Sequence, residues 1–178
     1  MHARKGAPLP SITAVSTWTD LFAAWRTSDG EGRRILEPDL EALRLRVWKR
    51  GGRNRKDEIL WFLANASIEG VQHLIWDALR EDDPRLIGDA LGAAVVSVTR
   101  ADWEIRDEDI AVLWQVLRDS RVKQRATALV ILDLVGRAYN QGELVEIVNT
   151  DPDPYLRERC ANVLKTGPVP SILVRYRS

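Results

Sequence analysis

Three stretches of the sequence share one pattern: Asp83-Pro84-Arg85-Leu86 leading into Ala90, Asp119-Ser120-Arg121-Val122 leading into Ala126, and Asp153-Pro154-Tyr155-Leu156 leading into Cys160. In each, an Asp is followed three residues later by an aliphatic residue and seven residues later by a small one. The successive offsets are 36 and 34 residues. In a sequence with helical periodicity, a fixed period of this size indicates stacked structural repeats.

Helix start and stop signals surround these stretches. Asp83-Pro84 and Asp153-Pro154 each place an N-cap before a Pro at the first helical position. Further starts are predicted at Pro38 after a loop over 28–32, at Ser67, at Ser120 as an N-cap, and at Asn140 with Glu143. The pattern predicts about nine helices with short loops, and no strand before the tail, which is compatible with an extended segment.

These signals predict an all-α protein, a short α-solenoid of antiparallel helix pairs. The chain of 178 residues is 45% hydrophobic and 29% charged, so it is long and apolar enough to bury a core. We expect a single helical domain over 17–166, a flexible N-terminal segment at 1–16 and a C-terminal tail at 167–178. Neighbouring pairs must stack, because one helix pair cannot bury its apolar face alone.

The repeated signature, Asp-x-x-aliphatic-Arg/Lys-x-x-small, resembles HEAT and HEAT-like repeats, in which it opens the second helix of each pair. The best match runs from Asp153 to Ala161 and the next from Asp119 to Ala126, whereas Ile87 replaces the basic residue in the first copy. The resemblance covers roughly 67–166. It implies the HEAT-like solenoid and is almost silent on function.

Several classes of site are disfavoured by the residues present. Cys160 is the single cysteine, so no internal disulfide forms, and no run of 18 apolar residues predicts a membrane span. We expect a cytoplasmic protein that does not contact a membrane. The two histidines lack ligand spacing, and no nucleotide or nucleophile motif is present, so we expect no metal, cofactor or catalytic residue. The sequence leans towards a protein that is not an enzyme.

The net charge of zero conceals a separation of charges along the chain. Seven basic residues and no acidic one lie within 44–56: Arg44, Arg46, Lys49, Arg50, Arg53, Arg55 and Lys56. Ten acidic residues lie within 77–109. Trp48 lies inside the basic run and Trp103 in a charged loop, so both are candidate contact residues, because an exposed Trp often anchors an interface. Trp18, Trp61, Trp76 and Trp114 are predicted to lie in the core.

Three interpretations of the basic run are open: a solvated surface, a docking site for an acidic protein, or a contact with nucleic-acid phosphates. The leading hypothesis is a non-enzymatic protein-binding module, an inhibitor, immunity-type protein or regulatory adaptor. It would use the solenoid groove and the basic surface. Its binding residues would be the seven basic residues within 44–56 together with Trp48 and Trp103. The alternative is nucleic-acid binding or DNA processing, since HEAT-like alkylpurine DNA glycosylases share the architecture and use Trp and Asp in a basic groove. A third hypothesis is a chromophore-lyase-like or chaperone-like role.

Overall fold

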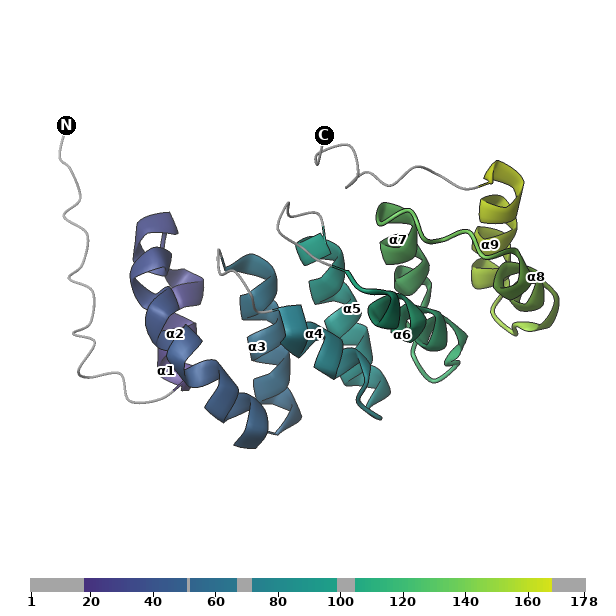
Figure 1. The fold of residues 1–178 in the computed structure, drawn as a ribbon. Helices are drawn as coiled ribbons and strands as arrows, with labels where there is room; N and C mark the ends of the chain where they lie inside the picture. Colours follow the sequence, from purple (N-terminus) through teal and green to yellow (C-terminus); the bar gives the residue numbers. More distant parts are fainter. Residues whose placement is uncertain (1–17, 51, 67–71, 99–104, 168–178) are drawn as a thin grey trace.

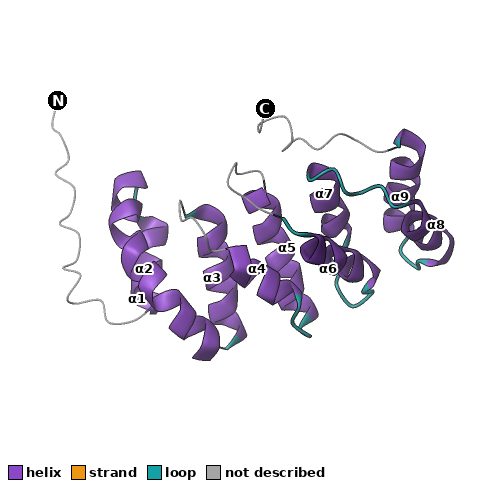
Figure 2. Cartoon of the chain, in the orientation of Figure 1, coloured by secondary structure: helices purple, strands orange, loops and turns teal. Residues whose placement is uncertain are grey.

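The computed structural model describes residues 18–50, 52–66, 72–98 and 105–167, and these residues form helices joined by loops, with no strand among them (Figure 2). Their nine helices are α1 (Trp18–Thr27), α2 (Gly30–Arg50), α3 (Arg53–Asn65), α4 (Gln72–Leu79), α5 (Pro84–Val98), α6 (Asp107–Arg118), α7 (Ala126–Leu134), α8 (Gln141–Thr150) and α9 (Pro154–Thr166). The predicted all-α class and helix number are confirmed for this part of the chain. The predicted N-terminal segment, the tail beyond 167, Ser67 and Trp103 lie outside the described residues.

The helices follow one another along the molecule, from α1 and α2 at one end to α8 and α9 at the other (Figure 1). Helices α4 and α5, α6 and α7, and α8 and α9 pack as pairs, and α3, α5, α7 and α9 contact each other in succession. Each helix therefore buries its apolar face against helices one or two places away in the sequence, and α3 packs most extensively against α5. Within the described ranges no helix has the length and apolar character to cross a membrane.

One apolar cluster extends through the molecule from Trp18 to Cys160. Its members include the small residues Ala90 and Cys160 of the repeated pattern, both fully buried. Small side chains at these positions let α5 and α9 approach their neighbours closely, and a larger side chain would overpack the site.

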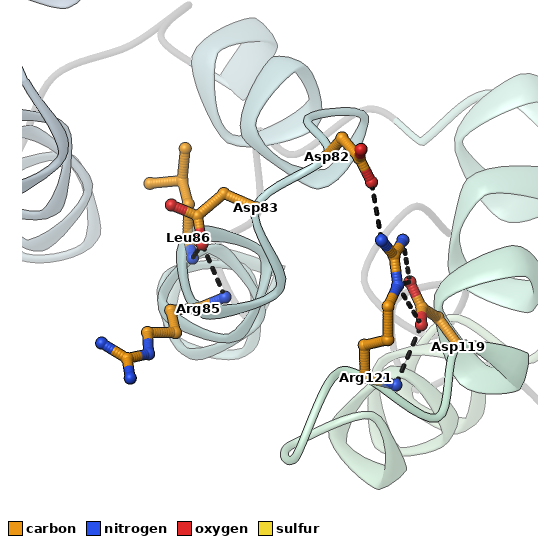
Figure 3. Close-up of polar contacts among 6 residues, drawn as sticks. All are labelled: Asp82, Asp83, Arg85, Leu86, Asp119 and Arg121. Atoms are coloured by element: carbon orange, nitrogen blue, oxygen red, sulfur yellow. Dashed lines mark hydrogen bonds and ion pairs between the residues drawn. The ribbon is translucent and has the colours of Figure 1, made fainter.

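The Asp residues of the repeated pattern hold the starts of helices. Asp83 Oδ1 accepts hydrogen bonds from the backbone N–H groups of Arg85 (3.0 Å) and Leu86 (3.3 Å) at the start of α5 (Figure 3). Asp153 Oδ1 accepts one from Tyr155 (3.0 Å) at the start of α9, as predicted. Each such cap contributes about 1 kcal/mol to stability.

The second copy of the pattern differs from the prediction that Ser120 caps a helix. Asp119 Oδ1 accepts the backbone N–H of Arg121 (3.0 Å), and α7 begins only at Ala126, after a series of turns. The guanidinium of Arg121 binds Asp119 and also reaches back to Asp82 before α5, at 2.8 Å in each case (Figure 3). This bridge joins two consecutive copies of the pattern at the surface.

The predictions for residues 28–38 were wrong in two respects. Helix α2 begins at Gly30, inside the predicted loop, and it continues through Pro38 instead of starting there. Asp29 explains the early start, because its carboxylate accepts the N–H of Gly32 at 2.9 Å. Pro38 cannot donate a backbone hydrogen bond, but Leu36 and Leu40 on either side of it are buried, so tertiary packing stabilises the helix there.

Candidate functional site between α1, α3 and α5

A hollow of about 670 Å³ lies between α1, α3 and α5. One turn of α1 forms its rim, α3 forms one wall and α5 forms the other. Its residues are Phe22, Arg26, Asp57, Glu58, Leu60, Trp61, Ala64, Asn65, Gly88, Asp89, Gly92, Ala93 and Val96. A volume of this size falls in the usual range of ligand-binding clefts.

Two glycines of α5 line the hollow, and one of them leaves space unfilled. Gly88 and Gly92 are four residues apart and therefore lie on the same side of the helix. A Cβ added to Gly92 would meet no atom within 4 Å, whereas one added to Gly88 would lie 2.4 Å from Oε1 of Gln124. The space in front of α5 is thus unfilled at Gly92 and bounded by Gln124 at Gly88.

Trp61 on the opposite wall is 44% exposed, which corrects the prediction that it lies in the core. Its ring makes edge contacts with two aromatic rings of α1, Phe22 at 5.8 Å and Trp25 at 5.4 Å between centroids. Trp25 is fully buried and also packs against Phe62. These contacts hold the Trp61 indole in one orientation while part of it faces solvent.

One cation contacts this indole, and two carboxyl groups line the same hollow. The Arg26 guanidinium lies 5.6 Å from the centroid of the Trp61 ring, in a cation–π contact at the rim. Asp57 is four residues before Trp61 on α3 and shares its side of the helix, and Asp89 projects from α5. The wall of the hollow therefore places an aromatic surface next to two carboxyl groups.

The pKa of the Asp57 carboxyl group lies above the usual value for an aspartate. Burial raises its pKa, and the charge of Asp89 together with a hydrogen bond between the two carboxyl groups raises it further, to about 6. Two carboxyl groups can hydrogen-bond to each other only when one of them holds a proton, so the pair shares a proton below this pH.

Arg53 is the cation nearest to this pair, and it serves three carboxylates at once. Its guanidinium lies 3.6 Å from Asp89, 3.9 Å from Asp57 and 3.8 Å from Asp83, all longer than a hydrogen bond. Arg53 Nε and Asp57 Oδ1 are buried atoms without a hydrogen-bond partner among the described residues. One guanidinium therefore forms ion pairs with three carboxylates without a close hydrogen bond to any of them.

Glu58 is the third acid of the hollow, but its carboxylate is already occupied. It accepts hydrogen bonds from Trp18 Nε1 at 2.9 Å and from the Arg55 guanidinium at 2.7 Å. The free acceptor capacity of the hollow therefore belongs to Asp57 and Asp89.

The structure divides the predicted basic run 44–56 instead of presenting it as one surface. Arg44 is buried and binds Glu41 one turn earlier on α2 through two hydrogen bonds. Arg53 and Arg55 face the acids of the hollow, as described above. Arg46 and Lys49 are exposed, and within the described ranges neither has an ion-pair partner. The side chain of Arg50 lies outside the described residues.

Trp48 was expected to offer an exposed contact surface, but it is buried. The Lys56 ammonium lies 5.2 Å from the centroid of its ring and also binds Glu81 at a distance of 2.5 Å. A lysine that covers the indole and an acid that holds the lysine leave Trp48 no surface for a partner. The structure therefore does not bring Trp48 together with Arg46 and Lys49 as an interface.

Sequence reasoning missed Asp57, Trp61, Asp89 and Gly92 as site residues. Two signals were present: Asp57 and Trp61 are separated by one helical turn, as are Gly88 and Gly92. Neither signal shows that the two helices face each other, which only the packing of α3 against α5 reveals.

Comparison of the chain with protein-family models, curated proteins and solved structures found no significant match. The resemblance to HEAT-like repeats therefore stays a prediction based on the repeated pattern. Among the described residues, no group of three or more His, Cys, Asp or Glu side chains is placed to hold a metal ion.

Proposed function

We propose that this chain is a non-enzymatic protein-binding module and that a segment of its partner docks in the hollow between α1, α3 and α5. The observation that carries the proposal is the exposed Trp61 indole, held in place by buried rings beside an unfilled space at Gly92. Rigid aromatic anchors next to pockets dominate the energetics of many protein interfaces, because they lose little entropy on binding.

The hollow is more suitable for a protein segment than for a nucleic acid. Asp57 and Asp89 lie on its walls and would repel phosphates, and Glu58 adds a third acid. Among the described residues that line it, Arg26 is the one cation, and its guanidinium lies over Trp61. The predicted acidic partner is also less well supported, because most described cations of the run 44–56 are paired within the protein.

Site-specific photo-crosslinking tests this proposal. A photoreactive phenylalanine analogue replaces Val96, which is 47% exposed on the α5 wall, in the protein expressed in its own cells. The matched control carries the analogue at Tyr155, 59% exposed on the distant α9. We expect a discrete protein adduct from position 96 and none of the same mass from position 155.

The captured protein is then purified, and its affinity is measured for the wild-type chain and for two variants. Trp61→Ala should weaken binding at least tenfold, about 1.4 kcal/mol, whereas Tyr155→Ala should leave the affinity unchanged. Equal losses from both variants, adducts that contain nucleic acid, or no adduct specific to position 96 would each contradict the proposal.

A further inference from the structure

The partner chemistry can be specified from the charges of the hollow, and this inference rests on the proposed function. Asp57 and Asp89 face each other across the α3–α5 contact, with one guanidinium, that of Arg53, at ion-pair distance from both. That guanidinium is also drawn towards Asp83. Asp57 Oδ1 is a buried acceptor without a hydrogen-bond partner among the described residues, so it can accept a hydrogen bond from a further donor.

Apolar residues line the hollow beside these carboxylates. Trp61 lies one turn beyond Asp57 on α3, and Ala93 lies one turn beyond Asp89 on α5, with Gly92 leaving space between the helices. Lys and Arg side chains combine an apolar stem with a cationic head. A stem lying along Trp61 and Ala93 would bring its head to Asp57 and Asp89.

Arg26 shows that this aromatic ring accepts a guanidinium on its face, since it already makes such a contact at the rim. The same contact shows what the partner has to avoid, because a second cation at the rim would be repelled by Arg26. The two ends of the hollow thus carry opposite charges, positive at α1 and negative where α3 meets α5.

We propose that the docked segment inserts a lysine or arginine side chain whose head binds the carboxyl pair of Asp57 and Asp89 from the hollow and whose apolar stem lies against Trp61. The segment enters with its cation towards α5 and with apolar or acidic residues towards Arg26. This orientation follows from charge complementarity, which fixes register and specificity at interfaces more than it fixes affinity.

The proton held by the carboxyl pair competes with this cation. Burial and the neighbouring Asp89 raise the pKa of Asp57 to about 6, so below this pH the pair carries one negative charge less. The groups facing Asp57 are Arg53 on its own helix, Asp83 just before α5 and Asp89 on α5, and neither aspartate gains positive charge on acidification. Binding of a cation should therefore weaken as the pH falls from 7 to 5.

The test adds two small probes to the full chain, acetyl-arginine amide and acetyl-citrulline amide. The two have nearly the same shape, but only the arginine probe is positively charged. Two-dimensional NMR follows the chemical shifts of the indole N–H of Trp61 and the backbone N–H of Gly92 as each probe is added to millimolar concentration. We expect the arginine probe to bind about fivefold more tightly than the citrulline probe at pH 7, and this preference to shrink at pH 5.

The double variant Asp57→Asn, Asp89→Asn should lose the preference, whereas Asp133→Asn, an exposed carboxylate on α7, should keep it. Thermal unfolding monitored by circular dichroism confirms that both variants are folded. Equal effects of the two probes, a preference that survives the double variant, or no shift from either probe overturns this inference. Failure of the proposed function has a different signature, since there the crosslinking at position 96 yields no partner.

Discussion

Loss of the guanidinium of Arg125 should destabilise the protein strongly. Arg125 precedes α7, and its side chain is 5% exposed, while that of its partner Asp151 is 8% exposed. Two hydrogen bonds join them, Nη1 to Oδ2 at 2.5 Å and Nη2 to Oδ1 at 2.6 Å, and Nη1 also reaches the carbonyl of Leu117 at 3.3 Å. The pair thereby connects the end of α6 and the start of α7 to the α8–α9 loop.

The magnitude follows from the burial of both charges. Arg125→Met keeps most of the apolar stem but leaves Asp151 buried without its counter-ion, which costs about 3–5 kcal/mol. For a chain of this length that corresponds to a melting temperature lower by roughly 10 °C. Adding Asp151→Asn removes the stranded charge but retains an acceptor for the N–H of Asp153, which lies 2.8 Å from Asp151 Oδ1. The double variant should therefore be more stable than Arg125→Met alone.

Urea denaturation of the wild type, both single variants and the double variant measures this coupling at neutral pH. A second series at low pH tests the cause. The hydrogen bonds from Arg125 hold the pKa of Asp151 below its usual value of 3.8 in the folded state. Stabilisation by Asp151 is therefore complete above that value and is lost as the pH falls through the lower folded-state pKa. The difference in unfolding free energy between the wild type and Arg125→Met should therefore shrink as the pH falls over the same range.

Two results would refute this reasoning. The first is a loss below about 1 kcal/mol for Arg125→Met, the value typical of a solvent-exposed pair. The second is a double variant whose loss equals the sum of the two single losses, because independent effects would show that the two side chains are not coupled.

Three further predictions concern single positions. Asp153→Ala should lower the unfolding free energy by about 1 kcal/mol through loss of the α9 cap, whereas Asp153→Asn should cost much less, as measured by urea denaturation. Gly92→Ala should raise it by up to about 1 kcal/mol, since the added methyl meets nothing, and Gly88→Ala should gain less because Gln124 must move. Burial raises the pKa of the Cys160 thiol to about 11, so a chromogenic disulfide reagent at pH 8 should leave it unmodified until denaturant is added; rapid reaction of the native protein would contradict its burial.

The features that local chemistry determines were predictable from the sequence. The caps at Asp83, Asn140 and Asp153 depend on side chains that reach backbone groups two or three residues away. Pro38 was misplaced for the opposite reason: its local preference for a helix start was outweighed by the packing of Leu36 and Leu40, which the sequence around it does not reveal.

The candidate site was not predictable, because it depends on contacts between distant residues. Lys56 is neutralised by Glu81, 25 residues later, and Arg53 by acids on and before α5. The roles expected for Trp48 and Trp61 were reversed. Charged neighbours suggested exposure of Trp48, although one of the nearby cations covers it, and an apolar run suggested burial of Trp61, although α3 has an open side at the hollow.

The order of helix packing has a consequence for folding kinetics. Helices contact those one or two places away in the sequence, so the contact order is low, and such proteins fold rapidly. Every wall of the hollow comes from α1, α3 or α5, all within residues 18–98. During synthesis these helices emerge before α6 to α9. We therefore expect the docking surface to be assembled on the nascent chain while its C-terminal half is still being translated.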